Sequence, residues 1–408
     1  MDVFDLRERL VQDYRRYAES FLSVKDERIA EHLQEELGSG LLWPDPPVQL
    51  NPAFEPGETI DDLVAEGDLH DECARIFRVG KEPGTGSFGK PMSLHRHQAD
   101  AIREAQADRN YVLTTGTGSG KSLAYIIPAV DHALRHGAKN GRLKALIIYP
   151  MNALANSQMG ELEKFLCHGY PDGQNPVSFA RYTGQEDDEK RQAIRANPPD
   201  ILLTNYVMLE YILTRPEDRK LIEKAGELRY LVLDELHTYR GRQGADVGLL
   251  SRRVRNACGS STMRMVGTSA TLAGPGSFEE QRTEVAAVAS RIFGVPVLAE
   301  SVVGETLRTE TDDADLEAPE FKSALTERVR RGRPSDSLQE FVADPLACWI
   351  ERTFGIRWNQ DDERYERCDP MPISGEKGAS RRLSESTGLD ATSCEAALRE
   401  TLFEPGRV

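Results

Sequence analysis

A glycine-rich stretch, "TTGTGSGKS" at residues 114–122, has the composition of a phosphate-binding loop. Glycine lets the backbone approach an anion, and a helix that begins just behind the turn adds the positive end of its dipole. We expect Lys121 to reach the β- and γ-phosphates of a nucleotide and the Ser122 hydroxyl to ligate Mg²⁺. The residues expected to hold the nucleotide are Thr115, Gly116, Thr117, Gly118, Ser119, Gly120, Lys121 and Ser122.

This stretch departs in one place from the strict pattern G-x-x-x-x-G-K-[ST], because Thr115 stands at the first glycine. The apolar run "NYVLTT" before the turn and the helical pattern "KSLAYIIPAVDHALRH" after it still predict the strand–loop–helix context that a phosphate loop requires. The alternative is an ordinary glycine-rich loop between a strand and a helix.

A second stretch, "YLVLDELH", supplies the acidic partner that such a loop needs for hydrolysis. An apolar strand ends at Leu233, so Asp234 and Glu235 fall at the strand end where ligands bind in open α/β sheets. We expect Asp234 to hold Mg²⁺, Glu235 to orient the attacking water and His237 to sense the γ-phosphate. The alternatives are a solvated strand end and a surface histidine.

The elements around these stretches alternate between strand and helix. Further apolar runs read "LKALIIYP", "DILLTNY", "LRYLVLDE", "MRMVGTSAT" and "VPVLAES", with helical patterns between them. Continuous apolar strands separated by helices predict an α/β fold, a parallel sheet with helices on both faces, over residues 91–308. Residues 1–90 read as two helices and a proline-rich extension, and residues 309–408 as short helices.

Composition narrows the classes of function. The 408 residues carry a net charge of −16, which argues against a protein that coats nucleic acid nonspecifically. If the chain binds a nucleic-acid strand, it must do so along a local basic surface. No apolar run spans a bilayer and no signal peptide is present, so we expect a cytoplasmic protein. The six cysteines are scattered without a C-x-x-C pair, which argues against disulfides and a zinc site.

The order of these stretches resembles the first RecA-like lobe of the superfamily 2 helicases of DEAD/DEAH-box type, from about Leu94 to Leu298. "TGTGSGKS" is similar to their phosphate loop, "DELH" to the DEAH box, "HRHQADAI" to the Q-motif, "YPMNALANSQ" and "TNYVMLEYIL" to motifs Ia and Ib, and "TSATL" to motif III. The resemblance implies that Gln98 reads adenine and that Ser269 and Thr271 couple the acidic pair to nucleic acid. The implied nucleic-acid contacts are Pro150, Asn152, Gln158, Thr183, Gly184, Thr204, Asn205 and Arg240.

The stretch "HTYRGRQGADVGLLSRRVRN" resembles the branch that contains large bacterial repair helicases of the MrfA type. "GLLWPDPPVQLNPAFEPG" is similar to Druantia- and DISARM-type helicases of phage defence. Hydroxyl and amide side chains hold a strand without reading its sequence, which reconciles the acidic charge with a nucleic-acid partner. Candidate phosphate contacts, or alternatively solvated arginines, are Arg181, Arg240, Arg242, Arg252 and Arg253.

The family's motors have a second RecA-like lobe that supplies arginine fingers, and nothing after Leu298 resembles it. We therefore expect the N-terminal portion of a larger DNA helicase or translocase, from a truncated or split gene, that uses ATP and Mg²⁺ but hydrolyses ATP weakly alone. The second lobe, in the same or a separate chain, single-stranded DNA and defence-system proteins are the expected partners. The alternatives are an RNA helicase or remodeller and an ATP-gated interaction module.

Overall fold

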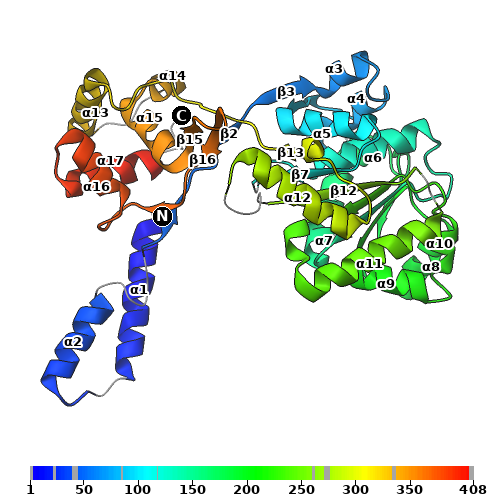
Figure 1. Cartoon of the computed structure of the whole chain (residues 1–408), viewed down its shortest axis with the longest axis horizontal. Helices are drawn as coiled ribbons and strands as arrows, with labels where there is room; N and C mark the ends of the chain where they lie inside the picture. The colour runs from blue at the N-terminus through cyan, green and yellow to red at the C-terminus, as the bar shows by residue number, and fades with distance from the viewer. Residues whose placement is uncertain are drawn as a thin grey trace. The chain divides into compact units, whose positions relative to one another are not determined.

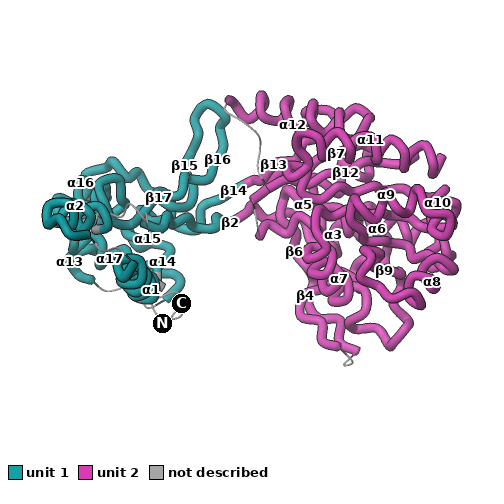
Figure 2. The backbone as a smooth tube through the Cα atoms, turned by 90° about the horizontal axis from the view of Figure 1, so that it is seen from below, with its two compact units in different colours: residues 1–53, 307–408 teal, residues 54–306 magenta. Residues whose placement is uncertain are grey.

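The computed structural model describes residues 3–21, 24–38, 45–83, 86–116, 118–259, 262–270, 276–332 and 337–403. The chain divides into two compact units, shown in Figure 2. Residues 54–306 form the sheet unit, and residues 1–53 with 307–408 form the helical unit. This division differs from the three segments expected from the sequence, because residues 54–90 belong with the sheet.

The sheet unit is built on seven parallel strands in the order β13-β7-β12-β11-β8-β10-β9 (Figure 1). The strands are β7 (Tyr111–Thr114), β8 (Ala145–Tyr149), β9 (Phe179–Arg181), β10 (Ile201–Asn205), β11 (Tyr230–Leu233), β12 (Arg264–Ser269) and β13 (Val302–Gly304). The central strands are buried along their whole length, as their continuous apolar runs predict. The expected α/β class with a parallel sheet is confirmed.

Helices cover both faces of this sheet and make two hydrophobic cores. On one face α5 (Arg96–Gln106), α6 (Leu123–Arg135) and α7 (Asn152–Leu166) pack on alternate strand residues such as Ile147 and Val232. On the other face the intervening residues, such as Leu146 and Leu231, pack on a second set of helices. That set is α9 (Tyr206–Thr214), α10 (Arg219–Glu223), α11 (Gly241–Cys258) and α12 (Phe278–Phe293), with α8 (Asp188–Ala196) beside it.

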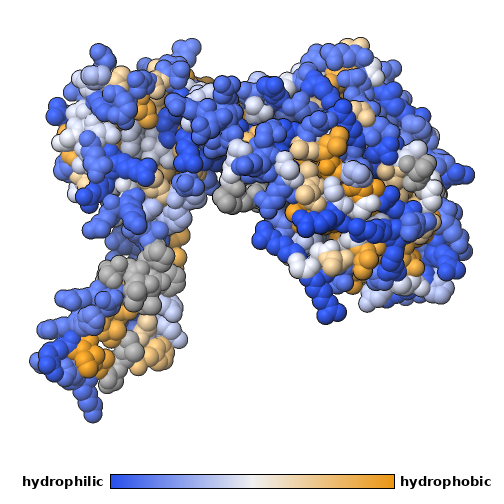
Figure 3. All heavy atoms as spheres, viewed as in Figure 1, coloured by the Kyte–Doolittle hydropathy of each residue, from blue (hydrophilic) through white to orange (hydrophobic). Residues whose placement is uncertain are grey.

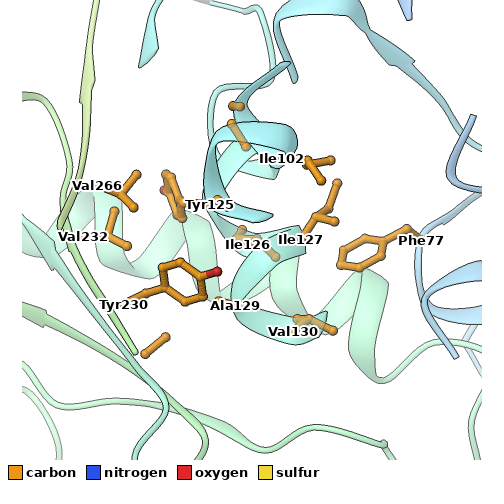
Figure 4. Close-up of a cluster of buried hydrophobic side chains, with 14 of the residues drawn as sticks. Phe77, Ile102, Tyr125, Ile126, Ile127, Ala129, Val130, Tyr230, Val232 and Val266 are labelled. Atoms are coloured by element: carbon orange, nitrogen blue, oxygen red, sulfur yellow. The ribbon is translucent and has the colours of Figure 1, made fainter. Parts of the chain in front are cut away.

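Helix α6 follows the phosphate loop and is held from two sides (Figure 4). Tyr125 faces Val232 and Val266 of the sheet, whereas Ile127 lies on the side of Ile102. Pro128 lies inside the helix and has no N–H to give to the carbonyl of Ala124. The hydroxyl of Tyr111 on β7 donates to that carbonyl instead, at 2.7 Å. The strand before the loop and the helix after it are therefore tied together directly.

The first part of the sheet unit carries short elements beside α5. Residues 59–77 have a helical sequence pattern but form two helices, α3 (Ile60–Ala65) and α4 (Cys73–Ile76), because Gly67 takes a left-handed turn at φ 84°. A capping box between Thr59 and Asp62 starts α3. Short antiparallel pairs join β3 (Pro56–Thr59) to β6 (Ser93–His95) and β4 (Arg78–Val79) to β5 (Lys90–Pro91). The strand expected at "VPVLAES" begins only at Val302, after the 3₁₀ turn η2 (Ala299–Ser301).

The helical unit has a small core of its own, in which Trp349, Ile350 and Phe354 are buried. Its helices are α1 (Val3–Ser20), α2 (Glu27–Gly38), α13 (Pro319–Arg331), α14 (Leu338–Val342), α15 (Pro345–Ile350), α16 (Ala379–Thr387) and α17 (Ala391–Phe403), with the π turn η3 (Glu351–Gly355). It also has a hairpin of β15 (Ile356–Asn359) and β16 (Arg364–Arg367) and a pair of β1 (Pro47–Val48) with β17 (Met371–Pro372), where the sequence predicted helices only. The chain passes between the units at β2 (Ala53–Phe54) and β14 (Leu307–Arg308). Within the described ranges no helix has the length and apolar character needed to cross a membrane.

Candidate functional site

The sequence-predicted residues meet at one edge of the sheet, where the parallel strands have their carboxyl ends. The phosphate loop follows β7, Asp234 follows β11 and Ser269 ends β12, and these three strands are neighbours. The motif Ia and Ib stretches follow β8 and β10, and the "YTG" turn of residues 182–184, which contains the predicted Thr183 and Gly184, follows β9; these three strands are neighbours on the other half. The strand order therefore separates the residues predicted to bind nucleotide from those predicted to bind nucleic acid. We call these two parts the nucleotide half and the nucleic-acid half of the edge.

The phosphate loop takes the backbone conformation that its glycines allow. Gly118 and Gly120 have φ values of 81° and 68°, in the left-handed region that favours glycine. A Cβ on Gly120 would lie 2.5 Å from Nε2 of Gln98, so both the backbone conformation and this close contact exclude a side chain at Gly120. Helix α6 begins at Leu123, directly behind Lys121 and Ser122. The loop thus has the strand–turn–helix geometry of an anion cradle.

Gln98 lies on the nucleotide half, but its amide contacts the loop itself. Its Nε2 donates to the carbonyls of Ser119 and Gly120 at 3.2 and 3.0 Å, and its Oε1 accepts from the N–H of His95 at 2.8 Å. Nε2 of His97 also lies 3.0 Å from the Ser119 carbonyl. The start of α5 therefore fixes the phosphate loop, and adenine recognition by Gln98 stays a prediction.

The structure brings the predicted catalytic side chains together. Nζ of Lys121 lies 3.6 Å from Oε1 of Glu235 and donates to the Thr115 carbonyl at 3.3 Å. Nδ1 of His237 lies 3.2 Å from Oε2 of Glu235. Glu235 has φ 55° and ψ 56°, a left-handed conformation that costs a residue other than glycine about 1–3 kcal/mol. The strained backbone of Glu235 thus places its carboxylate between Lys121 and His237.

Asp234 is buried beside Glu235 and held by a residue that the sequence analysis did not single out. The hydroxyl of Thr268 donates to Oδ1 of Asp234 at 2.6 Å and accepts from the N–H of Glu235 at 3.0 Å. Burial raises the pKa of Asp234 to about 6, which the Thr268 hydrogen bond and Lys121 oppose and the charge of Glu235 reinforces. A cation at this carboxylate would offset the cost of keeping it ionised in a buried place.

The donor set at this edge suits Mg²⁺. The Ser122 hydroxyl, behind the loop that follows β7, and the Asp234 carboxylate, after β11, offer hard oxygen ligands, and only β12 separates these two strands in the sheet. Nitrogen or sulfur ligands do not complete a site here, and the described residues contain no cluster of three histidine, cysteine or acidic side chains. The residues present therefore fit a magnesium ion that is held by few protein ligands and by phosphate.

Further contacts link the phosphate loop to its neighbouring strands. The N–H of Thr115 donates to the Ser269 carbonyl at 3.2 Å, so the start of the loop is bonded to motif III. The N–H of Gly116 donates to the carboxylate of Glu305, just after β13, at 3.0 Å. The Thr115 and Ser119 hydroxyls lie 2.6 Å apart. Two other predicted residues, Thr117 and Thr271, lie outside the described part of the chain.

The nucleic-acid half contains a pocket of about 470 Å³. Its lining includes four of the predicted residues, Asn152, Thr183, Gly184 and Asn205. Nδ2 of Asn205 donates to Oδ1 of Asn152 at 2.6 Å, while Oδ1 of Asn205 caps α9 by accepting from the Met208 N–H. Motifs Ia and Ib are thus joined by a side-chain hydrogen bond at the pocket.

The "YTG" turn is held by a buried carboxylate. Glu186 accepts from the N–H groups of Thr183 and Gly184 at 2.7 and 3.0 Å and from Nε of Arg181 at 2.5 Å. Burial alone would raise the pKa of Glu186, but these hydrogen bonds outweigh it and lower the pKa. The amides of this turn are therefore occupied, and Thr183 and Gly184 shape the pocket without N–H groups to offer a phosphate.

Other residues predicted to contact nucleic acid are placed less favourably for binding it. Thr204 is completely buried and donates to the Tyr182 carbonyl at 2.6 Å, so it positions β10 against β9. Pro150 is half-buried at the end of β8. Oε1 of Gln158 is buried within α7 and accepts no hydrogen bond from the described residues.

The candidate arginines also divide. Arg240 donates to the His237 carbonyl at 2.9 Å, on the nucleotide half, away from the pocket of Asn152. Arg252 donates to carbonyls of α11 and α12, and Arg253 binds Glu210 at 2.6–2.7 Å. Arg242 is exposed on α11. Arg252 and Arg253 therefore join neighbouring helices, and neither lines the pocket of Asn152.

An apolar hollow of about 1100 Å³ borders the nucleotide half between α11 and α12. His237 and Ser269 line one end, and the exposed Leu249 and Val288 lie along it. Figure 3 shows apolar surface over this region of the sheet unit. The 3₁₀ turn η1 (Leu236–Thr238), directly after the acidic pair, carries His237 to the rim of this hollow.

Sequence reasoning missed three residues of the edge, namely Thr268, Glu305 and Glu186. Thr268 directly precedes Ser269, and a hydroxyl at a strand end next to an acidic pair was an available signal. Glu305 follows the strand "VVG", where a strand-end carboxylate could also be noticed. Glu186 follows the "YTG" turn by two residues, the spacing at which a carboxylate can accept from the turn's own amides.

A parallel sheet with a phosphate loop and an acidic pair at its carboxyl edge defines a RecA-like ATP-binding fold. Residues 95–277 match the family model of the DEAD/DEAH box helicases. The chain therefore contains a DEAD/DEAH box helicase domain, as the sequence motifs predicted.

Curated relatives agree with this assignment. The chain is 24% identical over 392 residues to the Druantia protein DruE of Escherichia coli (strain UMEA 4076-1), covering 68% of this chain and 21% of that protein. It is 35% identical over 193 residues to the uncharacterized ATP-dependent helicase YprA of Bacillus subtilis (strain 168), covering 47% of this chain and 24% of YprA. The chain thus spans about a fifth to a quarter of the length of these relatives.

Among solved structures, the DUF1998 helicase MrfA bound to DNA aligns with a TM-score of 0.48 at 21% identity. The alignment covers 78% of this chain and 41% of that one.

Proposed function

We propose that this chain is the first motor lobe of an ATP-dependent helicase or translocase that acts on single-stranded DNA. One observation carries the proposal: Lys121 of the phosphate loop, the buried Asp234 and the strained Glu235 converge at one sheet edge. Hydrolysis of a nucleoside triphosphate requires a cation for the phosphates, a carboxylate for the metal and a carboxylate for water. Lys121, Asp234 and Glu235 would fill these three roles.

The residues act on ATP mainly by position and charge. The loop amides and Lys121 bind the phosphates and stabilise charge that develops on the γ-phosphate. Ser122 and Asp234 would hold Mg²⁺, which supplies charge neutralisation at the phosphates. Glu235 orients the attacking water and accepts its proton, and His237 lies 3.2 Å from that carboxylate. Binding of phosphate would draw Lys121 from Glu235 and leave the carboxylate available to water.

Motif III couples ATP hydrolysis to the bound nucleic-acid strand. Ser269 joins the phosphate loop through its carbonyl and borders the hollow beside His237, so a change at the γ-phosphate reaches β12 directly. Asn152 and Asn205 on the other half suit a strand held by its backbone. We take DNA as the substrate because recognition of RNA would need groups placed at the 2′-hydroxyl, and none of these motif residues is specific to it.

The chain alone should turn over ATP slowly. The described residues contain one large parallel sheet, of seven strands, and an arginine finger from a second RecA-like lobe contributes on the order of 10³–10⁵ in rate in related enzymes. We propose that this lobe completes the cleft, in the same or another chain. The likeness to the Druantia protein DruE supports a placement near Druantia-type helicases. We further propose a role in phage defence or DNA repair in the cytoplasm, with other defence proteins as partners.

The test is steady-state ATP hydrolysis by the chain together with a second lobe, measured without a strand, with single-stranded DNA and with single-stranded RNA. Stimulation by DNA and its loss in Lys121→Ala and Glu235→Gln are expected. Stimulation by RNA alone would favour an RNA helicase. Nucleotide binding without hydrolysis in every condition would favour an ATP-gated interaction module and contradict the proposal.

A further inference from the structure

The pocket on the nucleic-acid half contains a ring and two cations to which the sequence analysis assigned no role. Tyr211 on α9, Arg215 just after α9 and Arg191 on α8 line it beside the motif residues. Its lining includes no aspartate or glutamate. In a chain of net charge −16, an arginine-lined pocket without carboxylates is a local basic track of the kind that a strand requires.

Tyr211 and Arg215 form a stacked pair. Cζ of Arg215 lies 3.9 Å from the centroid of the Tyr211 ring, and 42% of Tyr211 is exposed. No described carboxylate pairs with the guanidinium of Arg215. Rings and guanidinium planes are the surfaces on which unpaired bases stack, and stacking accepts any base because every base has a π face.

Arg191 supplies a second cation across the pocket. Its only described ion pair is with Asp188 at 3.0 Å, and the side chain of Asp188 is 85% exposed, so that pair is weak. Nε of Arg191 is buried and has no hydrogen-bond partner among the described residues. A phosphate oxygen would supply the acceptor that this N–H lacks, and buried donors are costly to leave unpaired.

The neighbouring carboxylates do not compete for these cations. Glu186 is committed to the amides of Thr183 and Gly184 and to Arg181. Glu210, on the same helix as Tyr211, accepts from Nη1 of Arg253 through both of its carboxylate oxygens at 2.6–2.7 Å. The pocket therefore keeps a net positive lining, with the Asn152–Asn205 amide pair as a neutral hydrogen-bonding wall.

We propose that this pocket holds one nucleotide of the bound single strand, with the base stacked on the Tyr211–Arg215 pair and the adjoining phosphate on Arg191. The inference rests on the proposed function, and it adds a base contact to a half that the motifs alone would use only for the sugar-phosphate backbone. Such a contact would hold the strand at one register between steps without reading its sequence.

The experiment compares affinities of the whole chain for two labelled strands of equal length by fluorescence anisotropy, one of thymidines and one of abasic sites. Tyr211→Ala should weaken binding of the thymidine strand about 5- to 150-fold, the value of one stacked base. It should leave binding of the abasic strand unchanged, because no base is present to stack. Tyr211→Phe keeps the ring and should bind both strands as the unchanged chain does.

The phosphate contact has its own readout. Arg191→Gln should weaken both strands equally and reduce the slope of log affinity against log salt by about 0.7, the single-strand value for one phosphate. Arg253→Gln, outside the pocket and already paired with Glu210, is the matched control and should leave the slope unchanged.

Equal loss on both strands in Tyr211→Ala, or no loss on either, would overturn the inference while leaving the proposed function intact. Failure of the unchanged chain to bind any strand would overturn both. Circular dichroism of each variant identifies a loss that comes from unfolding.

Discussion

Replacing Asp234 with asparagine should stabilise the sheet unit while removing its metal site. Burial raises the pKa of Asp234 from its ordinary value of 3.8 to about 6. The difference corresponds to about 3 kcal/mol of folding free energy that the ionised carboxylate costs above pH 6 in the absence of a cation. Asparagine retains an Oδ1 that can accept from Thr268 and carries no charge to desolvate, so Asp234→Asn removes this cost.

The raised pKa of Asp234 also determines how the folding stability changes with pH. The folded state binds more protons at Asp234 than the unfolded state between pH 3.8 and about 6, so the stability of the unchanged chain falls as pH rises through that window. The advantage of Asp234→Asn should therefore be near zero at pH 4, grow up to about pH 6 and stay constant at pH 8. Mg²⁺ at saturating nucleotide should stabilise the unchanged chain at pH 8 and not the variant.

Amide hydrogen exchange of peptides covering β11 and β12 measures the stability of the sheet unit, because it follows opening of the sheet itself. Tryptophan fluorescence would miss it, since the described tryptophans, Trp349 and Trp358, both belong to the helical unit. Asp108→Asn, at an exposed ion pair with Arg229 and Arg264, is a control for loss of a carboxylate. Equal protection of Asp234→Asn and the unchanged chain at pH 8, or an advantage that does not vary between pH 4 and pH 8, would refute the reasoning.

Three further outcomes follow from single contacts. Thr268→Val should lower ATP turnover in the two-lobe enzyme at least tenfold and raise the Mg²⁺ concentration required, whereas Thr268→Ser should restore both; equal activity of Val and Ser variants would contradict its role in holding Asp234. Glu305→Gln should tighten binding of a Mg²⁺-nucleotide several-fold in a calorimetric titration, because a negative charge is removed next to the Gly116 N–H; weaker binding would contradict this. Asp344→Ala should destabilise the helical unit by about 3–5 kcal/mol in urea, followed by Trp349 fluorescence, because the buried Arg328 loses its partner and α15 its cap; an unchanged midpoint would contradict it.

The convergence of the residues proposed for catalysis could be predicted because their order along the chain is itself informative. A lysine inside a glycine-rich turn and two carboxylates behind an apolar run each restrict the local geometry, and Lys121 and Glu235 do lie together. The parallel sheet follows from apolar runs separated by helices, and it places all carboxyl ends at one edge.

The remaining contacts depend on which strands are neighbours, which sequence patterns do not specify. Thr268 reaches Asp234 only because β12 lies beside β11 with Gly267 opposite Leu233. Glu305 reaches Gly116 because β13 adds beside β7 from almost two hundred residues away. The occupied amides of Thr183 and Gly184 were missed because a hydroxyl and two N–H groups read as free until the side chain of Glu186 is placed.

The central claim, that the edge around Lys121 binds a Mg²⁺-nucleotide, is tested most directly by calorimetric titration of the 408-residue chain with a nonhydrolysable ATP analogue and Mg²⁺. Lys164→Ala, at an exposed ion pair with Glu161 toward the end of α7, is the matched lysine control. The account predicts saturable binding that Lys121→Ala abolishes and Lys164→Ala preserves. Binding that survives Lys121→Ala unchanged, or an absence of binding by the unchanged chain at millimolar analogue, would contradict it.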